Sequence, residues 1–333
     1  MRNTFLVMTS IAERDHPVLQ QFAVQSGTHK IPFIVIGDTK SPKDFILEGC
    51  DFYSIERQQD LRFRLSETLP YKHYARKNLG YLIAMSKGAE TIIETDDDNL
   101  PRKNFWNNRT KLATAHLIKN KGWVNIYRYF TDINIWPRGF ALENLQNKLP
   151  ELEEQVAVEC PIQQGLADDN PDVDAIYRLT LPLPVRFTQG NNVALSVQAI
   201  CPFNSQNTTW FKEAFPLMYL PSFCSFRMTD IWRSFVAQRI AWTCGWSILF
   251  HNSTVWQQRN EHNLMKDFID EISGYVNNRD IMNELVSLSL NNGIENIYDN
   301  LLACYSKLIE MQLIHPDEIK LIHRWISDLQ TIY

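Results

Sequence analysis

Three consecutive aspartates, Asp96, Asp97 and Asp98, follow directly on an apolar run, and this stretch points to a chemical function. Adjacent carboxylates repel one another unless a cation or strong hydrogen-bond donors share them. Alternate side chains of a strand share a face, so Asp96 and Asp98 can converge while Asp97 contacts ribose or supports the loop. Mg²⁺ and Mn²⁺ prefer oxygen ligands and complete their shells with water and substrate phosphates. We therefore expect Asp96 and Asp98 to hold Mn²⁺ or Mg²⁺ beside a nucleotide-sugar donor; the alternative is a solvated turn.

Further candidates for donor binding precede the aspartates. Arg76 and Lys77 lie in a predicted helix and can face an anionic diphosphate, or they form an ordinary basic helix face. Asp38 ends a predicted strand, where it can accept hydrogen bonds from a base or ribose, or act as a turn carboxylate. Thr9, at the end of the first predicted strand, and Asn78 complete the expected donor-binding residues.

A second constellation surrounds Asp230, which lies where a helix should begin. Either Thr229 or Asp230 can serve as the helix cap. A carboxylate in this place is also suited to act as a general base, with Arg227 and Arg233 to hold its orientation. In an inverting glycosyl transfer, such a base takes the proton of the acceptor hydroxyl while a metal stabilises the leaving diphosphate. We expect Asp230 to be that base.

Residues 257–262 contain two further candidates in what we expect to be a flexible loop that closes on the site. Arg259 can meet a phosphate, and His262 can complete the shell of the metal. His251 is a competing ligand with a weaker case. The alternative is a polar stretch of surface.

The expected acceptor side contains Trp136, Arg138 and Arg227. Trp136 and Trp210 can stack on sugar rings through their faces, but the chain has nine tryptophans, and several must belong to the core. The acidic residues 168–174 form either a solvated turn or part of an acceptor site.

The elements that position these residues follow from alternating short apolar runs and amphipathic stretches. Such a βαβαβ pattern predicts a mainly parallel sheet with helices on both faces, and ligands bind at the carboxyl ends of its strands. The expected strands are residues 5–9, 32–37, 51–55 and 90–95, and the expected helices are residues 17–25 and 71–86.

The rest of the chain has a less regular pattern. We expect a domain of residues 1–260, in which the catalytic site lies, and a helical extension of residues 261–333. Within the first domain, we expect a strand at 123–129, a loop at 130–140, a polar and partly helical stretch at 143–160, strand and loop at 185–195 and 201–210, and a helix at 228–243 capped near Thr229.

Composition excludes several classes of protein. With 333 residues, 44% of them hydrophobic and 21% charged, the chain is globular. The net charge of −5 and the absence of a basic stripe argue against a nucleic-acid partner. Six cysteines without a Cys-x-x-Cys pair disfavour zinc and fit a reducing compartment. The apolar N-terminal run is too short for a signal peptide or membrane anchor, so we expect a cytoplasmic chain without a transmembrane segment.

Several longer motifs resemble the STELLO family of glycosyltransferases, in order and over roughly residues 5 to 270. The matching stretches are Glu-Thr-Asp-Asp-Asp-Asn (94–99), Ile-Trp-Pro-Arg-Gly-Phe (135–140), Pro-Phe-Asn-Ser-Gln-Asn-Thr (202–208), Arg-x-Thr-Asp-Ile-Trp-Arg (227–233), Ala-Gln-Arg (237–239), Arg-Asn-x-His (259–262) and Lys-Asp-Phe (266–268).

The resemblance implies a GT-A fold, an Asp-x-Asp metal motif and a nucleotide-sugar donor. Plant members of the family have an N-terminal transmembrane anchor, reside in the Golgi and are linked to cellulose synthase assembly. Because this chain begins at its first expected strand, we do not expect it to share their location, and nothing in the sequence supports the same partner.

We thus expect a metal-dependent GT-A glycosyltransferase that moves a sugar from a UDP- or GDP-sugar to a hydroxyl group of a glycan or other acceptor. Homo-oligomer formation stays open. Two rivals remain: a nucleotidyltransferase and a non-catalytic scaffold of the same fold. A nucleotidyltransferase usually has a glycine-rich phosphate loop after its first strand. Residues 9–15 contain no glycine, which counts against that reading.

Overall fold

The N-terminal part of the sheet is parallel and buried on both faces. A computed structural model describes residues 3–187, 190–259 and 263–333. Its first four strands run side by side in the order β3-β2-β1-β4 and all point the same way. Their apolar runs have no polar alternation because helices cover both faces. The bounds are β1 (Thr4–Thr9), β2 (Phe33–Ile36), β3 (Asp51–Tyr53) and β4 (Thr91–Thr95).

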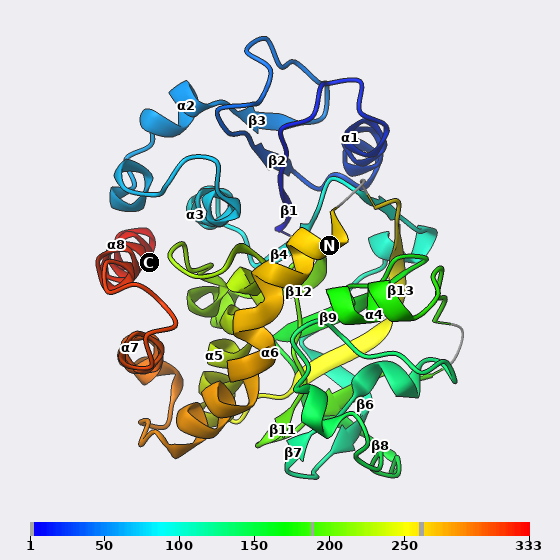
Figure 1. The fold of residues 1–333 in the computed structure, drawn as a ribbon. Helices are drawn as coiled ribbons and strands as arrows, with labels where there is room; N and C mark the ends of the chain where they lie inside the picture. The colour runs from blue at the N-terminus through cyan, green and yellow to red at the C-terminus, as the bar shows by residue number, and fades with distance from the viewer. Residues whose placement is uncertain (1–2, 188–189, 260–262) are drawn as a thin grey trace.

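Helices lie on opposite faces of these strands (Figure 1). Helix α1 (Pro17–His29) packs on one face together with the buried side chains of Leu6 and Phe33. Helix α3 (Lys77–Ser86) packs on the other face against β1 and β2. The predicted α/β fold with a largely parallel sheet between helices is therefore confirmed.

The sheet continues beyond β4 with strands of mixed direction. Strand β12 runs antiparallel to both β4 and β9, and β13 is parallel to β9 but antiparallel to β10. The full order is β3-β2-β1-β4-β12-β9-β13-β10-β6-β8, with β5 on β13 and a separate pair β7–β11. The bounds are β5 (Asn99–Pro101), β6 (Leu112–Ile118), β7 (Gly122–Trp123), β8 (Gln155–Glu159), β9 (Ile162–Asp168), β10 (Val193–Leu195), β11 (Ala199–Ile200), β12 (Asn207–Phe211) and β13 (Ile248–Gln257).

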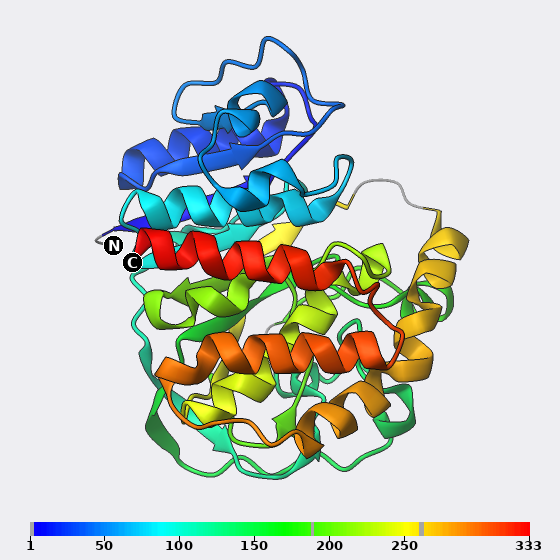
Figure 2. The same cartoon turned by 90° about the vertical axis from the view of Figure 1, so that its left-hand side faces the viewer.

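The expected C-terminal helices are present and share the main core with the sheet domain. Figure 2 shows α8 lying alongside α3, with α7 beside it. The carboxylate of Asp328 on α8 accepts hydrogen bonds from the backbone N–H groups of Arg64 and Leu65. The boundary expected near residue 260 stays a prediction. The remaining α-helices are α2 (Ile55–Gln59), α4 (Ala175–Thr180), α5 (Thr229–Thr243), α6 (Leu264–Ser287), α7 (Ile297–Glu310) and α8 (Glu318–Ile332).

Two local predictions were wrong, and a third missed a strand. Residues 123–129 hold only the end of β7 and a 3₁₀ turn (Ile126–Tyr129), where the Asn125 amide donates to the carbonyl of Ile135. Residues 143–160 were expected to be partly helical; a 3₁₀ helix (Leu142–Asn144) overlaps their start, and they also hold the edge strand β8, because β6 offers a pairing partner. Helix α5 has no side-chain cap: Asp230 lies inside its first turn.

None of the helices in the described part of the chain combines the length and the hydropathy that a membrane crossing requires.

Candidate active site

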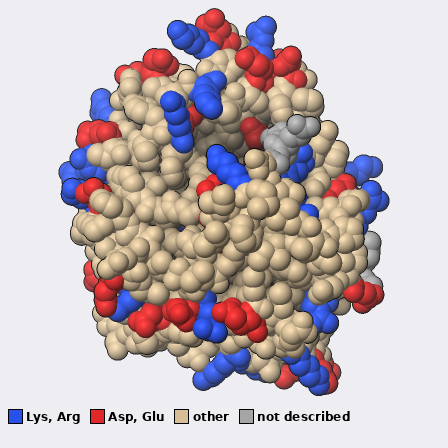
Figure 3. All heavy atoms as spheres, viewed as in Figure 1, with Lys and Arg blue, Asp and Glu red and all other residues tan. Residues whose placement is uncertain are grey.

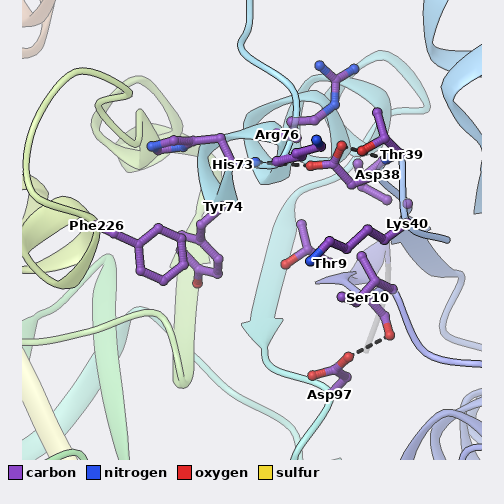
Figure 4. A pocket seen from close by; sticks show the side chains of 14 residues that line it. Thr9, Ser10, Asp38, Thr39, Lys40, His73, Tyr74, Arg76, Asp97 and Phe226 are labelled. Atoms are coloured by element: carbon purple, nitrogen blue, oxygen red, sulfur yellow. Dashed lines mark hydrogen bonds between the residues drawn. The ribbon is translucent and has the colours of Figure 1, made fainter. Parts of the chain in front are cut away.

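The candidate site lies where the chain changes direction across the sheet. From β1 the chain adds β2 and β3 on one side, and it then returns to place β4 on the other side of β1. In open α/β sheets, ligands bind at the carboxyl ends of the strands beside such a switch point. The residues at these ends are Thr9 and Ser10 after β1, Asp38 after β2 and the three aspartates after β4. The hydroxyl of Ser10 donates to the Asp97 carboxylate at 2.5 Å and thereby links the two sides (Figure 4).

A crevice opens there in two connected parts. The first, which we call the Asp38 cavity, has a volume of about 330 Å³. Asp38 accepts hydrogen bonds from the backbone N–H groups of Thr39 (2.6 Å) and His73 (3.0 Å). The rings of Tyr74 and Phe226 meet edge to face at 6.2 Å and form the opposite wall (Figure 4).

The second part, which we call the Asp98 cavity, has a volume of about 260 Å³. It shares Thr9, Tyr74, Asp97 and Phe226 with the first, so the two parts are adjacent. Figure 3, viewed as in Figure 1, shows a hollow in the upper part of the molecule, with charged side chains at its edge. The charged residues that line this second part are Asp96, Asp97, Asp98, Arg138, Asp172, Arg178, Arg227, Asp230 and Arg259.

Asp96 and Asp98 have different partners. Asp96 accepts from the Lys77 ammonium at 2.8 Å and from the Tyr74 hydroxyl at 3.2 Å. Burial raises the pKa of Asp96, and the charge of Lys77 offsets part of that effect. Asp98 accepts at its Oδ2 atom from the Gln257 amide at 2.8 Å. Burial, and then the negative charge of Asp96, raise the pKa of Asp98 to about 7.

The donor set around Asp98 fits a cation. Its Oδ1 atom and the Oε1 atom of Gln257 are inaccessible to solvent and have no hydrogen-bond donor within the described ranges. Buried oxygens without donors are costly, and a hard cation satisfies oxygens of this kind. Among the described residues, no cluster of three or more His, Cys, Asp or Glu side chains could hold a metal. The protein would thus supply few ligands, as Mg²⁺ sites commonly do.

Helix α5 positions Asp230. One turn later on the same helix, Arg233 forms a fully buried ion pair with Glu94 of β4 at 2.8 Å, which fixes the first turn of α5 beside the aspartates. Both oxygens of Asp230 accept from Arg138, at 3.1 and 3.0 Å, and Oδ2 also accepts from the Ser205 backbone N–H at 3.2 Å. Burial by itself would raise the pKa of Asp230, but the charge and hydrogen bonds of Arg138 outweigh it and lower the pKa.

Two expected donor-binding residues have structural contacts, although Arg76 also lines the Asp38 cavity. The Arg76 guanidinium is buried and donates to the Gln58 side chain at 2.8 Å and to the Leu69 carbonyl at 3.1 Å. Asn78 forms paired hydrogen bonds of 2.9 Å with the backbone of Leu220 and joins α3 to that loop. These contacts use most of the donors of Arg76 and all the polar atoms of Asn78, which disfavours phosphate binding by either.

The other expected basic residues do face the Asp98 cavity, although each has a carboxylate partner. Arg227 pairs with Glu271 at 2.8 Å, and Arg259 pairs with Asp267 at 2.6 Å. Burial, and then the charge of Arg227, lower the pKa of Arg259. His262, the expected third metal ligand, lies outside the described residues.

Of the expected acceptor residues, Trp136 is packed in the core. Its indole N–H donates to Asp174 at 2.6 Å, and its ring meets Tyr177 edge to face at 5.1 Å. Trp136 is not among the residues that line either part of the crevice. The sequence alone does not show which of the nine tryptophans is buried. Arg138 does line it, between Asp172 (2.8 Å) and Asp230.

Residues not singled out as ligands in the sequence complete the site. Tyr74 bonds to the Ser205 hydroxyl and to Asp96, and Gln257 holds Asp98. Arg178 lines the Asp98 cavity, and burial, followed by the charge of Arg259, lowers its pKa to about 9. Tyr74 and Lys77 lie three residues apart before β4, a spacing that puts both on one helical face and could have suggested their pairing.

These features describe a crevice lined by carboxylates and arginines at a sheet switch point. Residues 227–333 match the family described as STELLO glycosyltransferases. Over 320 residues, the chain is 29% identical to "Probable glycosyltransferase STELLO2" and 28% identical to "Probable glycosyltransferase STELLO1", both from Arabidopsis thaliana. Each alignment covers 90% of this chain and 41% of the relative. The resemblance to STELLO glycosyltransferases is thereby confirmed, and the chain spans about two fifths of the length of these relatives.

Two solved structures are weakly similar. "Crystal Structure of a Mycobacterial Protein" has a TM-score of 0.44 and 9% identity, and covers 83% of this chain and 74% of its own. Glucosyl-3-phosphoglycerate synthase from Mycobacterium tuberculosis, in complex with phosphoglyceric acid, has a TM-score of 0.41 and 10% identity, with coverage of 83% and 80%. Both likenesses are too weak to inform the function of this chain.

Proposed function

We propose that the protein is a metal-dependent GT-A glycosyltransferase that transfers a sugar from a UDP- or GDP-sugar to a hydroxyl group of a glycan or other acceptor. One observation carries the proposal: a buried Asp98 oxygen has no donor among the described residues and lies beside Asp96 at the switch point, in a cavity that four arginines also line. Negative and positive groups in one crevice suit a metal–diphosphate pair. The similarity to the STELLO relatives supports the same class of reaction.

Asp96, Asp98 and the Gln257 amide oxygen would hold Mn²⁺ or Mg²⁺. When bound, such an ion neutralises the charge that develops on the leaving diphosphate. Asp96 would then either lose its hydrogen bond from Lys77 or contact both Lys77 and the ion through its carboxylate. Arg227 and Arg259 line the same cavity and would bind the phosphates.

The Asp38 cavity would bind the nucleoside. Its side walls are Tyr74 and Phe226, whose rings offer faces or edges to a base. Asp38 would accept hydrogen bonds from base or ribose. Asp97, which is held by Ser10 between the two parts of the crevice, would contact ribose or support the loop.

Asp230 would act as the general base and take the proton of the acceptor hydroxyl onto one of its carboxylate oxygens. Its lowered pKa keeps it ionised at neutral pH, and Arg138 holds it in one orientation. Deprotonation of the acceptor on one side of the sugar, with departure of the diphosphate on the other, makes the reaction inverting. The Asp230→Asn variant should lose transfer while it still binds nucleotide; unchanged turnover would remove Asp230 from this role.

A non-catalytic scaffold is the second candidate, and one observation favours it. Lys77 already neutralises Asp96, and Arg138 already neutralises Asp230, so two central carboxylates have cationic partners without any ligand. A cytoplasmic location and homo-oligomer formation stay expectations, and neither of them distinguishes the enzyme from the scaffold.

Thermal unfolding with UDP and GDP, with and without Mn²⁺, separates the two candidates. A ligand at 100 times its Kd stabilises the folded state by about 2.7 kcal/mol. The enzyme should respond to one nucleotide class and only when Mn²⁺ is present, and Asp98→Asn should abolish the response. A scaffold should respond to neither. A panel of nucleotide sugars, followed by their hydrolysis, would then identify the donor.

A further inference from the structure

A second polar cavity, which we call the Arg109 cavity, lies elsewhere on the sheet and has a volume of about 470 Å³. It shares no described lining residue with either part of the crevice. The loop before β6 and the middle of β13 form its walls. Its polar lining includes Asn107, Arg109, Gln163, Asn192, His251 and Asn252.

Among the described residues, Arg109 has no partner for its charge. Both terminal nitrogens of its guanidinium are inaccessible to solvent and have no hydrogen-bond acceptor in the described part of the chain. The guanidinium lies 5.2 Å from the ring centre of Phe105. Burial lowers the pKa of Arg109 to about 10, so the group stays positively charged at neutral pH.

The cavity offers no compensating negative group. No aspartate or glutamate occurs among the described residues that line it. His251 lies close enough to sense the charge: burial, and then the charge of Arg109, lower the pKa of His251 to about 4, so it is neutral. Arg138 and Arg233 differ in this respect, because each binds a carboxylate through two nitrogens. The buried Arg76 lacks a carboxylate but donates to neutral oxygens, which Arg109 does not do through its terminal nitrogens. An unpaired buried charge is costly, and Arg109 is therefore suited to an anion from outside the chain.

The neutral groups of the cavity indicate that a ligand must also donate hydrogen bonds, besides carrying a negative charge for Arg109. The side-chain NH₂ groups of Gln163, Asn192 and Asn252 donate to backbone carbonyls at 2.8, 3.1 and 2.9 Å. Their amide oxygens remain as acceptors, and hydroxyl groups are the matching donors. A ligand that satisfies both requirements has one oxyanion and several hydroxyls.

We propose that the Arg109 cavity binds a small anionic carbohydrate, with its phosphate or carboxylate against Arg109 and its hydroxyls on the amide oxygens around it. A sugar phosphate and a uronic acid share this chemistry. Because the cavity and the crevice have no lining residue in common, this proposal does not depend on the proposed glycosyl transfer.

Binding is tested by calorimetric titration of the full chain with glucose 6-phosphate, glucuronate, inorganic phosphate and neutral glucose. The Arg109→Met variant keeps an unbranched stem and removes the charged guanidinium. Arg62→Met, at an exposed arginine, is the matched control. We expect the wild type and the control to bind one of the two acidic sugars, with Arg109→Met weaker by about tenfold or more. Which acidic sugar binds identifies its source.

The same variants have a readout that needs no ligand. Removal of an uncompensated buried charge should leave the Tm of Arg109→Met equal to or above that of the wild type. A strongly lowered Tm would overturn the proposal, since Arg109 would then have a structural role. Four titration results would also overturn it. Arg109→Met could bind the acidic sugar as tightly as the wild type does, or the wild type could bind none of the ligands. Glucose could bind as tightly as glucose 6-phosphate, or inorganic phosphate could do so.

Discussion

Two acidic segments follow strands of the same sheet, yet their carboxylates have different surroundings. In residues 168–174, Asp168 accepts from Arg102, from the Ser253 hydroxyl at 2.7 Å and from the Phe187 N–H at 2.9 Å. After β4, Asp98 has a buried oxygen that receives no hydrogen bond from the part of the chain that the structure describes. A count of acids therefore does not distinguish a candidate metal site from a structural turn, and the hydrogen-bond partners of each carboxylate must be compared.

The expectation that residues 168–174 form either a solvated turn or an acceptor site was only partly right. Asp172 faces the Asp98 cavity beside Arg138, but Asp168 and Asp174 are buried structural groups. Asp174 caps α4 by accepting from the Tyr177 N–H at 2.8 Å.

The largest expected difference between the segments is in activity. Asp98→Ala should lower the turnover of nucleotide sugar by about 100-fold or more, because charge stabilisation at the leaving group is lost. The free energy of unfolding should change little, since the variant also removes repulsion from Asp96. Donor hydrolysis and urea unfolding measure the two effects, and turnover at the level of the wild type would contradict the metal site.

Asp168→Asn should show the opposite pattern. Loss of the charge weakens three hydrogen bonds to a buried carboxylate, which should cost about 2 kcal/mol of stability in urea unfolding. Asp169→Asn is the matched control, because Asp169 pairs with the exposed Arg186 and such pairs contribute about 0–1 kcal/mol. Equal stability of the two variants would refute the structural assignment of Asp168.

Trp136→Phe sharpens the distinction on the expected acceptor side. The variant removes the indole donor to Asp174 and should cost about 1 kcal/mol of stability. Because Trp136 lies outside the crevice, the KM values for donor and acceptor should stay the same. A raised KM for the acceptor alone would restore the sugar-stacking role that the sequence suggested.

The last expected effect is a change in pH dependence. Burial raises the pKa of Asp174 to about 6, so the folded chain holds this proton at a higher pH than the unfolded chain does. The contribution of Asp174 to the free energy of unfolding therefore falls as the pH rises from about 4 to about 6. Asp174→Asn retains a good helix cap and should lack that slope. A slope unchanged from the wild type would assign it to other groups.

The parallel half of the sheet could be predicted because its strands are consecutive and its apolar runs are local. The aspartates at the end of β4 and the position of Asp230 at the start of α5 could be predicted for the same reason. The antiparallel insertion of β12 and the edge strand β8 could not be predicted, because their pairing depends on residues far along the chain.

Individual side chains show the same limit. Arg76 and Lys77 are neighbours, but one binds Gln58 away from the aspartates and the other binds Asp96. The pairing of Arg138 with Asp230 joins residues 92 positions apart, and no local pattern indicates it. Arg109 follows two asparagines in an ordinary polar loop, and only the packed structure shows that its charge is unpaired.

Anomalous diffraction from crystals grown with Mn²⁺ and UDP or GDP tests the central claim most directly. We predict a manganese peak between Asp96 and Asp98, with the diphosphate against it and the Asp98 Oδ1 atom in its shell. A crystal with nucleotide bound and no manganese signal at these two carboxylates would contradict the account.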